Sequence, residues 1–300
     1  MINLGDIMKN AYKNHIIIPA FNVPYLSMIE PILETVKRLD SFCLIEVARP
    51  DIEKFQAKSF KDVYVEFKSK ADLSFARLHQ DHIPVIDEDL MEVDWKSLIN
   101  EAVNLGYDSV MIDGSRLRLD ENIKVTKAVV EIAHRKDVPV EAELGAVMGH
   151  EKGPLPPYEE LFASGKGFTD LQEAKRFVNE TNVDWLSVAI GNIHGAISGV
   201  AKDQKKVEAR LNIDHLKRLS DITCIPLVLH GGSGVKRESV LEAVKNGITK
   251  INVGTNLRQA YEKGLKDNID SAKRAVAVEV EYIITDYYGI KGSSSILSKN

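Results

Sequence analysis

The sequence has only two cysteines in 300 residues, Cys43 and Cys224, and they lie far apart along the chain. This spacing favours neither a disulfide framework nor a thiolate zinc site. Both cysteines lie in apolar runs, so we expect two buried thiols.

An excess of basic residues is lacking too, since the formal charge is −5. Phosphate backbones select basic surfaces, so no nucleic acid is expected as a main partner.

Long apolar runs are also missing. None approaches the roughly 20 residues that a membrane-spanning helix needs, and residues 1–12 lack the apolar core of a signal peptide. We therefore expect a cytoplasmic protein that does not associate with a membrane. The apolar share of 44% is ordinary for a globular chain, and 300 residues are enough for one large α/β domain.

What the chain does contain is an alternation of short apolar runs and amphipathic stretches. The runs predicted as strands are 16–20, 42–47, 73–78, 109–112, 139–142, 185–190, 225–229 and 250–253. Helices are expected between them, including one opened by a capping box at Ser27, one capped by Asp94 and one opened by Thr169. Eight such units without a linker predict an α/β fold of one domain over residues 1–300, a closed (β/α)8 TIM barrel rather than an open doubly wound sheet. Residues 292–300 are expected to be a flexible tail.

Polar side chains gather at the carboxyl ends of these predicted strands, where barrel enzymes build their active sites. Three strands lead to a histidine: His82, His194 and His230. A single histidine at a strand end would more often be structural, but three at the same end of one barrel are hard to assign to packing. Neutral imidazoles with an open fourth position suit a catalytic Zn²⁺. Other candidates at these ends are Asn22, Asp81, Asp113, Glu143 and Asn252.

A glycine-rich segment, His-Gly-Gly-Ser-Gly, occupies residues 230–234 just ahead of a predicted helix. Backbone N–H groups that no side chain obstructs bind phosphate at such a place. Residues 252–255 supply more donors after the eighth strand, and barrel phosphate sites commonly form from the loops after strands 7 and 8. An isolated Gly-Gly-Ser-Gly could also be a simple turn. The position of this segment after the seventh predicted strand favours the phosphate site.

Six segments are similar to one known family. They are 79–82 (His-Gln-Asp-His), 110–115 (Val-Met-Ile-Asp-Gly-Ser), 140–145 (Val-Glu-Ala-Glu-Leu-Gly), 188–195 (Val-Ala-Ile-Gly-Asn-Ile-His-Gly), 226–234 (Pro-Leu-Val-Leu-His-Gly-Gly-Ser-Gly) and 250–255 (Lys-Ile-Asn-Val-Gly-Thr). In this order they resemble the class II, metal-dependent ketose-bisphosphate aldolases, which include fructose- and tagatose-bisphosphate aldolases. The resemblance runs from Pro19 to about Arg258.

The resemblance implies the metal site. His82, His194 and His230 would be the zinc ligands, and Asp113 and Glu143 would match the family's alternative or second metal position. The family often adds a monovalent cation near the phosphate. The required chemistry agrees, because cleaving a carbon–carbon bond beside a carbonyl leaves an enediolate that needs an electron sink. No lysine stands at the strand ends considered above to form a Schiff base instead.

The resemblance also implies roles in proton transfer and substrate binding. Asp81 would be the acid/base at the aldehyde oxygen, and Asn22 would support the enediolate. Glu151 matches the glutamate that moves the ketose C3 proton, and it lies in a segment, 146–166, whose Gly and Pro content predicts a mobile functional loop. The dihydroxyacetone phosphate half would be held by Gly195, Gly231, Ser233, Asn252, Thr255 and Arg258.

Departures from the family pattern concentrate on the aldehyde side. Residues 46–50 replace the usual Ser-Gly-type segment, and residues 83–92 are inserted after the first histidine. Residues 197–198 are Ile-Ser where the family often has Tyr-Lys, and 116–119 replace a His-x-Pro-Phe segment. These changes leave the zinc chemistry in place and predict a rebuilt pocket for the aldehyde half.

Three hypotheses follow. The first is a zinc-dependent aldolase of carbohydrate metabolism or glycolysis, a homodimer or homotetramer that cleaves fructose 1,6-bisphosphate, or a related phosphorylated ketose such as tagatose 1,6-bisphosphate, to dihydroxyacetone phosphate and an aldehyde. The second is a catalytically silent barrel that serves as a partner subunit of an aldolase, against which Asp81 and the three histidines count. The third is a metal-free phosphate-binding isomerase or synthase, which leaves the histidines unexplained.

Overall fold

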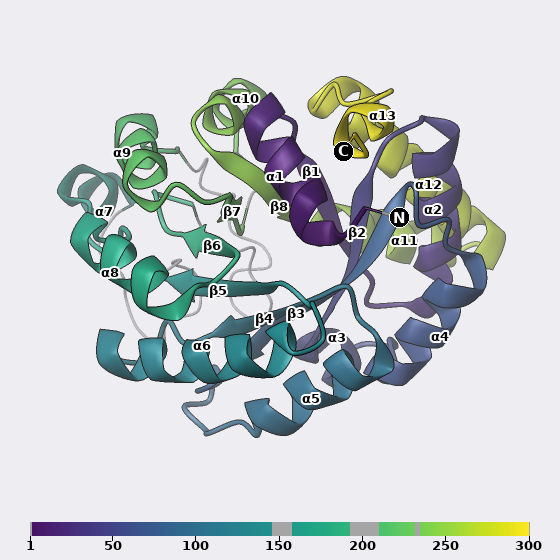
Figure 1. Cartoon of the computed structure of the whole chain (residues 1–300). Helices are drawn as coiled ribbons and strands as arrows, with labels where there is room; N and C mark the ends of the chain where they lie inside the picture. The colour runs from purple at the N-terminus through teal and green to yellow at the C-terminus, as the bar shows by residue number, and fades with distance from the viewer. Residues whose placement is uncertain (1, 146–157, 193–209, 232–234, 300) are drawn as a thin grey trace.

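The computed structural model describes residues 2–145, 158–192, 210–231 and 235–299. Its centre is a closed barrel of eight parallel strands that neighbour one another in sequence order (Figure 1). The strands are β1 (Ile18–Asn22), β2 (Cys43–Ala48), β3 (Ala76–Pro84), β4 (Ser109–Asp113), β5 (Val140–Leu144), β6 (Trp185–Val188), β7 (Leu227–Leu229) and β8 (Ile248–Val253). Because β1 pairs with both β2 and β8, the ring is complete. The predicted (β/α)8 TIM barrel is confirmed.

Helices surround the barrel and connect successive strands (Figure 1). They are α2 (Ile29–Arg38), α4 (Phe60–Lys70), α5 (Trp95–Leu105), α6 (Leu119–His134), α8 (Leu171–Thr181), α9 (Ile213–Thr223), α10 (Arg237–Lys245), α11 (Thr255–Leu265) and α12 (Ile269–Tyr282). Shorter pieces are η1 (Leu26–Met28), α3 (Arg49–Glu53), α7 (Tyr158–Ser164) and the π-helix η3 (Ile283–Tyr287). Within the described residues, no helix combines the length and the apolar content needed to cross a membrane.

Two expected helix starts are wrong. Ser27 lies inside η1, and its hydroxyl group pairs with Tyr261 Oη at 2.7 Å instead of capping α2. Asp170, not Thr169, caps α8, because its Oδ1 accepts from the backbone N–H groups of Gln172 and Glu173. The Asp94 cap of α5 is confirmed, with Oδ1 3.2 Å from the backbone nitrogen of Ser97.

On β1, β2, β6 and β7 the two faces pack into different apolar clusters, because alternate side chains point in opposite directions. On β2, Cys43, Ile45 and Val47 join the large cluster between barrel and helices, whereas Leu44 joins a second cluster inside the barrel. The second cluster closes the N-terminal end of the barrel with α1 (Leu4–Asn14); it comprises Leu4, Ile7, Met8, Ala11, Ile18, Ala20, Phe42, Leu44, Trp185, Val228 and Leu297.

Two further sequence expectations need correction. Cys43 is buried, but Cys224 is exposed, because it is the left-handed C-cap residue of α9 with φ 55°. The stretch expected to be a flexible tail contains a last helix, α13 (Ser294–Leu297). Its Leu297 is buried, and the Leu297 carbonyl accepts a hydrogen bond from Asn10 Nδ2 at 3.0 Å. The tail is therefore anchored on α1 and completes the N-terminal closure.

Candidate active site

The described candidate residues meet at the C-terminal end of the barrel. Asn22 and Asp113 are the last residues of β1 and β4, and His230 follows β7 directly. Asp81, Glu143 and Asn252 lie near the ends of β3, β5 and β8. Four candidates lie outside the described residues: Glu151, His194, Gly195 and Ser233.

An irregularity in β3 brings two adjacent residues into the site. The strand was expected to end at Leu78, but it continues to Pro84, and its register with β4 shifts between Gln80 and Ile83. His82 there has a φ of 40°, a left-handed conformation that is rare for a residue with a side chain. Bulges of this kind redirect side chains near active sites. Asp81 and His82 therefore both reach the site, although neighbours in a regular strand point to opposite faces.

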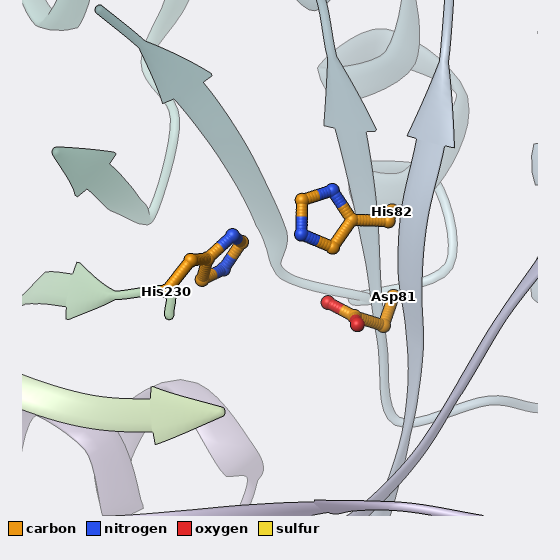
Figure 2. A group of neighbouring side chains, drawn as sticks. All are labelled: Asp81, His82 and His230. Atoms are coloured by element: carbon orange, nitrogen blue, oxygen red, sulfur yellow. The ribbon is translucent and has the colours of Figure 1, made fainter. Parts of the chain in front are cut away.

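The imidazoles of His82 and His230 face each other across the barrel mouth, with ring centroids 4.4 Å apart (Figure 2). His82 Nδ1 lies 3.8 Å from Asp113 Oδ2, and His230 Nδ1 lies 3.1 Å from Glu143 Oε2. Ligand atoms of Asp81, His82 and His230 all lie within 4.8 Å of one another, as do those of His82, Asp113 and Glu143. This mixed set of imidazoles and carboxylates can hold a divalent cation.

The charges around the two imidazoles favour a cation as well. Burial opposes protonation of His82, but the neighbouring Asp81 carboxylate outweighs it and raises the His82 pKa to about 9. Burial likewise opposes protonation of His230, and hydrogen bonds to Glu141 and Glu143 outweigh it and raise the His230 pKa to about 10. The negative surroundings that attract protons here would attract a metal ion in the same way.

Asp81 is held at both oxygens by side-chain amides. Asn22 Nδ2 donates to Asp81 Oδ2 at 3.1 Å, and Asn252 Nδ2 donates to Oδ1 at 3.0 Å. Burial disfavours the charged carboxylate, yet the positive charges of His82 and Lys250 prevail and lower the Asp81 pKa to about 2. Asp81 is thus an ionised, fully positioned carboxylate beside the imidazole pair.

Four residues of the barrel interior were not among the candidates from the sequence. Glu46, His79, Glu141 and Lys250 are fully buried directly beneath the site. Three of them precede a candidate residue by two positions on the same strand, and this period of two places both on one face. That spacing points to His79, Glu141 and Lys250 but not to Glu46.

Lys250 is charged rather than nucleophilic. Burial alone would lower its pKa, but the carboxylates of Glu141 and Glu46 outweigh burial and raise it further above its ordinary range. Its Nζ lies 3.0 Å from Glu141 Oε2 and 3.2 Å from Glu46 Oε2. A Schiff base requires a neutral amine, so this environment opposes that chemistry.

Glu141 orients His230 from below. Its Oε1 lies 2.9 Å from His230 Nε2, and its Oε2 accepts a hydrogen bond of 2.8 Å from Trp185 Nε1. A carboxylate that accepts the proton of one imidazole nitrogen leaves the other nitrogen for a metal. Here the other nitrogen, Nδ1, faces Glu143 and the barrel mouth.

The end of β5 is supported by an amide on α6. Asn122 Nδ2 donates to the backbone carbonyl of Glu143 at 3.0 Å. This approach needs a glycine at position 114, because a Cβ there would lie 2.2 Å from Asn122 Oδ1. The residue after Asp113 therefore helps to place Glu143.

The residues expected to bind phosphate differ in the contacts that they make. Thr255 is the first residue of α11, whose N-terminus carries backbone donors, and Gly231 follows His230. Asn252, by contrast, is engaged with Asp81 and Lys250. Arg258 pairs with both carboxylate oxygens of Glu262 at 3.0 Å, and its guanidinium lies 5.3 Å from the Phe55 ring centroid.

Two of the segments that depart from the family pattern, 46–50 and 83–92, touch each other at the rim. Arg49 on α3 pairs with Glu53 at 2.5 Å and with Asp87 of the 83–92 insertion at 3.2 Å. Asp87 Oδ1 also accepts the backbone N–H groups of Asp89 and Met91, which closes the insertion into a compact loop. Asp51 on α3 is buried, which raises its pKa to about 7.

Comparisons with known proteins agree with this geometry. A family model described as fructose-bisphosphate aldolase class-II matches residues 2–288. The crystal structure of the YdjI aldolase from Escherichia coli K12 superposes with a TM-score of 0.77 at 28% identity, over 97% of this chain and 98% of that one.

Two more distant structures show the same fold. One is described as a putative fructose-1,6-biphosphate aldolase from Coccidioides immitis, with a TM-score of 0.74 and 23% identity over 96% of both chains. The other is the fructose-bisphosphate aldolase of Campylobacter jejuni, with a TM-score of 0.72 and 19% identity over 97% of this chain and 96% of that one. Since the family model spans nearly the whole chain, this protein belongs to the class II fructose-bisphosphate aldolase family and is an aldehyde-lyase of a kind that generally uses a divalent metal.

Proposed function

We propose that this protein is a zinc-dependent aldolase that reversibly cleaves a phosphorylated ketose into dihydroxyacetone phosphate and an aldehyde, with fructose 1,6-bisphosphate as the reference substrate. The observation that carries the proposal is the imidazole pair of His82 and His230, 4.4 Å apart, beside the ionised Asp81. A catalytically silent barrel would have no need for this buried and charged arrangement, whose maintenance costs stability.

The donor set fits zinc. His82 and His230 supply imidazole nitrogens, and the resemblance adds His194, which lies outside the described residues. Three protein nitrogens with an open position are typical of catalytic zinc. A divalent ion there would supply Lewis-acid chemistry at the ketose carbonyl. Asp113 and Glu143, close to the same imidazoles, would offer a second position.

Asp81 is suited to move the proton at the departing aldehyde oxygen. In the cleavage direction it would accept the hydroxyl proton, and in condensation it would return that proton. Asn22 and Asn252 hold both of its oxygens, so the carboxylate keeps its orientation without the substrate. Glu151, outside the described residues, is our candidate for the proton at ketose C3, and Asn22 would also support the enediolate.

We propose that the dihydroxyacetone phosphate half binds over the ends of β7 and β8. Backbone donors at the N-terminus of α11, beginning at Thr255, would meet the phosphate. Gly195, Gly231, Ser233 and Asn252 would contribute as in the family, with a monovalent cation nearby. Arg258 would have to exchange its pair with Glu262 for the phosphate. A cytoplasmic homo-oligomer acting in carbohydrate metabolism remains part of this proposal.

A panel of phosphorylated ketoses tests the proposal. Retro-aldol rates are measured for fructose 1,6-bisphosphate, tagatose 1,6-bisphosphate and a ketose 1-phosphate, with bound metal quantified on the same samples. We expect activity that chelation removes and Zn²⁺ restores. Full activity in chelator-treated, metal-free protein, or no cleavage of any ketose by metal-loaded protein, would contradict the proposal.

A further inference from the structure

Lys250 occupies the centre of the buried charges beneath the site and has no exposed surface. Its Nζ lies 3.2 Å from Glu46 on β2, 3.0 Å from Glu141 on β5 and 2.7 Å from Oδ1 of Asn252 on its own strand. The ammonium group therefore contacts three side chains from three parts of the barrel.

The contact with Asn252 determines which way that amide points. An ammonium group has only donors, so it must face the amide oxygen, and the amide NH2 must then face away. In that orientation Asn252 Nδ2 donates to Asp81 Oδ1 at 3.0 Å. If the amide turned over, two donors would face each other at Lys250, and the amide oxygen would face the Asp81 carboxylate. Lys250 thus secures one of the two hydrogen bonds that hold Asp81.

The contact with Glu141 reaches the imidazole pair by a second route. Glu141 Oε2 faces Lys250 and Trp185, while Oε1 faces His230 Nε2 at 2.9 Å. The ammonium group and the indole N–H together hold the carboxylate so that its other oxygen meets the imidazole. Second partners of this kind decide how a metal-binding histidine is oriented.

We propose that Lys250 is a positioning residue that acts on both halves of the chemistry: through Asn252 it orients Asp81, and through Glu141 it orients His230. This inference rests on the proposed metal-dependent function. Lys250 touches neither the substrate nor the metal position. Losing its side chain should therefore weaken metal binding and proton transfer together.

Glu46 makes a clean test possible. Its carboxylate accepts no hydrogen bond within the described part of the chain, and burial raises its pKa well above the ordinary range; Lys250, 3.2 Å away, favours the charged form. Removing Lys250 alone would leave the buried Glu46 carboxylate without a counter-charge, which can prevent folding. Replacing Glu46 and Lys250 together by methionine removes both members of this pair, so neither side chain is left buried without the other.

The experiment compares Glu46→Met with Glu46→Met/Lys250→Met. Zn²⁺ affinity is measured by competition with a chromophoric chelator, and kcat and KM are measured separately on the best ketose. Relative to Glu46→Met, we expect the double variant to bind Zn²⁺ roughly 10- to 100-fold more weakly. At saturating Zn²⁺ its kcat should still be lower, with KM little changed, since Asp81 has lost its alignment.

Two further variants separate the routes. Asn252→Ala should lower kcat but leave Zn²⁺ affinity near that of the wild type, whereas Glu141→Gln should weaken Zn²⁺ binding. Equal Zn²⁺ affinity and equal kcat in Glu46→Met and Glu46→Met/Lys250→Met would overturn the proposal. Lys250 would then only compensate the charge of the buried carboxylates. Failure of the proposed aldolase function can be told apart from failure of the Lys250 proposal. In that case the wild-type protein itself would cleave no ketose, while the Zn²⁺ affinities would still test the Glu141 route.

Discussion

The two halves of the barrel interior are built from the same strands but have opposite character. On β1, the inward residues Ile18 and Ala20 belong to the apolar closure, and two positions further on Asn22 binds Asp81. On β7, Val228 belongs to the closure, and two positions further on His230 faces His82. The period of two is unbroken, so one strand carries stability at its N-terminal end and chemistry at its C-terminal end.

Between these halves lies a layer of paired charges. Glu46, Glu141 and Lys250 are completely buried, and such groups are tolerated only when they compensate one another. Typical TIM barrels fill this space with branched apolar residues. The polar half of the interior therefore depends on the apolar closure below it for stability. Changes in the two halves should therefore have separable consequences.

The largest expected effect comes from a substitution that disrupts only the polar half of the barrel interior. His82→Ala removes a proposed metal ligand, and we expect Zn²⁺ affinity to fall by more than the roughly 100-fold typical of lost outer partners, with activity falling to background. The far-ultraviolet circular dichroism and the urea midpoint should stay close to wild type. His134→Ala is the matched control, because His134 pairs with Asp184 on the outside of the barrel. Similar losses in both variants would contradict the assignment.

The next largest effect comes from a substitution that separates proton transfer from metal binding. Asp81→Ala should retain metal and fold but lose turnover by roughly 10²- to 10⁴-fold, the usual contribution of general acid–base catalysis. Bound metal is quantified on the samples used for kcat. Turnover like that of the wild type would remove Asp81 from the mechanism. Lost metal would instead make it a ligand, which its closeness to His82 and His230 allows.

The apolar half should respond in stability and not in catalysis. Met8 on α1 is fully buried in the closure, and Met8→Ala should reduce the free energy of unfolding by roughly 2–5 kcal/mol. Urea unfolding measures the loss, and kcat of the folded fraction should stay unchanged. Met91→Ala, the same substitution at an exposed residue, should stay within roughly 0.5 kcal/mol of wild type. A drop in kcat for Met8→Ala would mean that the two halves are coupled.

Sequence patterns predicted the barrel because strand periodicity and helix amphipathicity are local properties. They also pointed to Asp81, His82 and His230, since strand ends converge in any such barrel. They could not show that His82 turns inward, because that depends on the register shift against β4. They missed Lys250 because a lysine inside a barrel is acceptable only opposite Glu46 and Glu141, which lie more than a hundred residues away.

The smallest effect concerns the rim and the aldehyde half of the substrate. Arg49 could bind a second phosphate, but it is already paired with Glu53 and Asp87, and this group of three carries a net negative charge. We therefore expect weak activity on fructose 1,6-bisphosphate and a preference for a ketose whose aldehyde half lacks a phosphate. Turnover of fructose 1,6-bisphosphate at roughly 10⁴ M⁻¹s⁻¹ or more, far above every other ketose, would contradict this expectation.

Asp87→Asn should remove one of the two carboxylates that hold Arg49, leaving Glu53, while keeping the Oδ1 acceptor that closes the insertion. A partly exposed ion pair is worth roughly 1 kcal/mol or less, so kcat/KM for fructose 1,6-bisphosphate relative to a ketose monophosphate should rise about fivefold at most. Glu88→Gln removes the same charge from the neighbouring position and serves as control. An equal rise in both variants would assign the effect to the net charge of the loop, and only a rise specific to Asp87→Asn would identify Arg49 as a phosphate ligand held in check by the insertion.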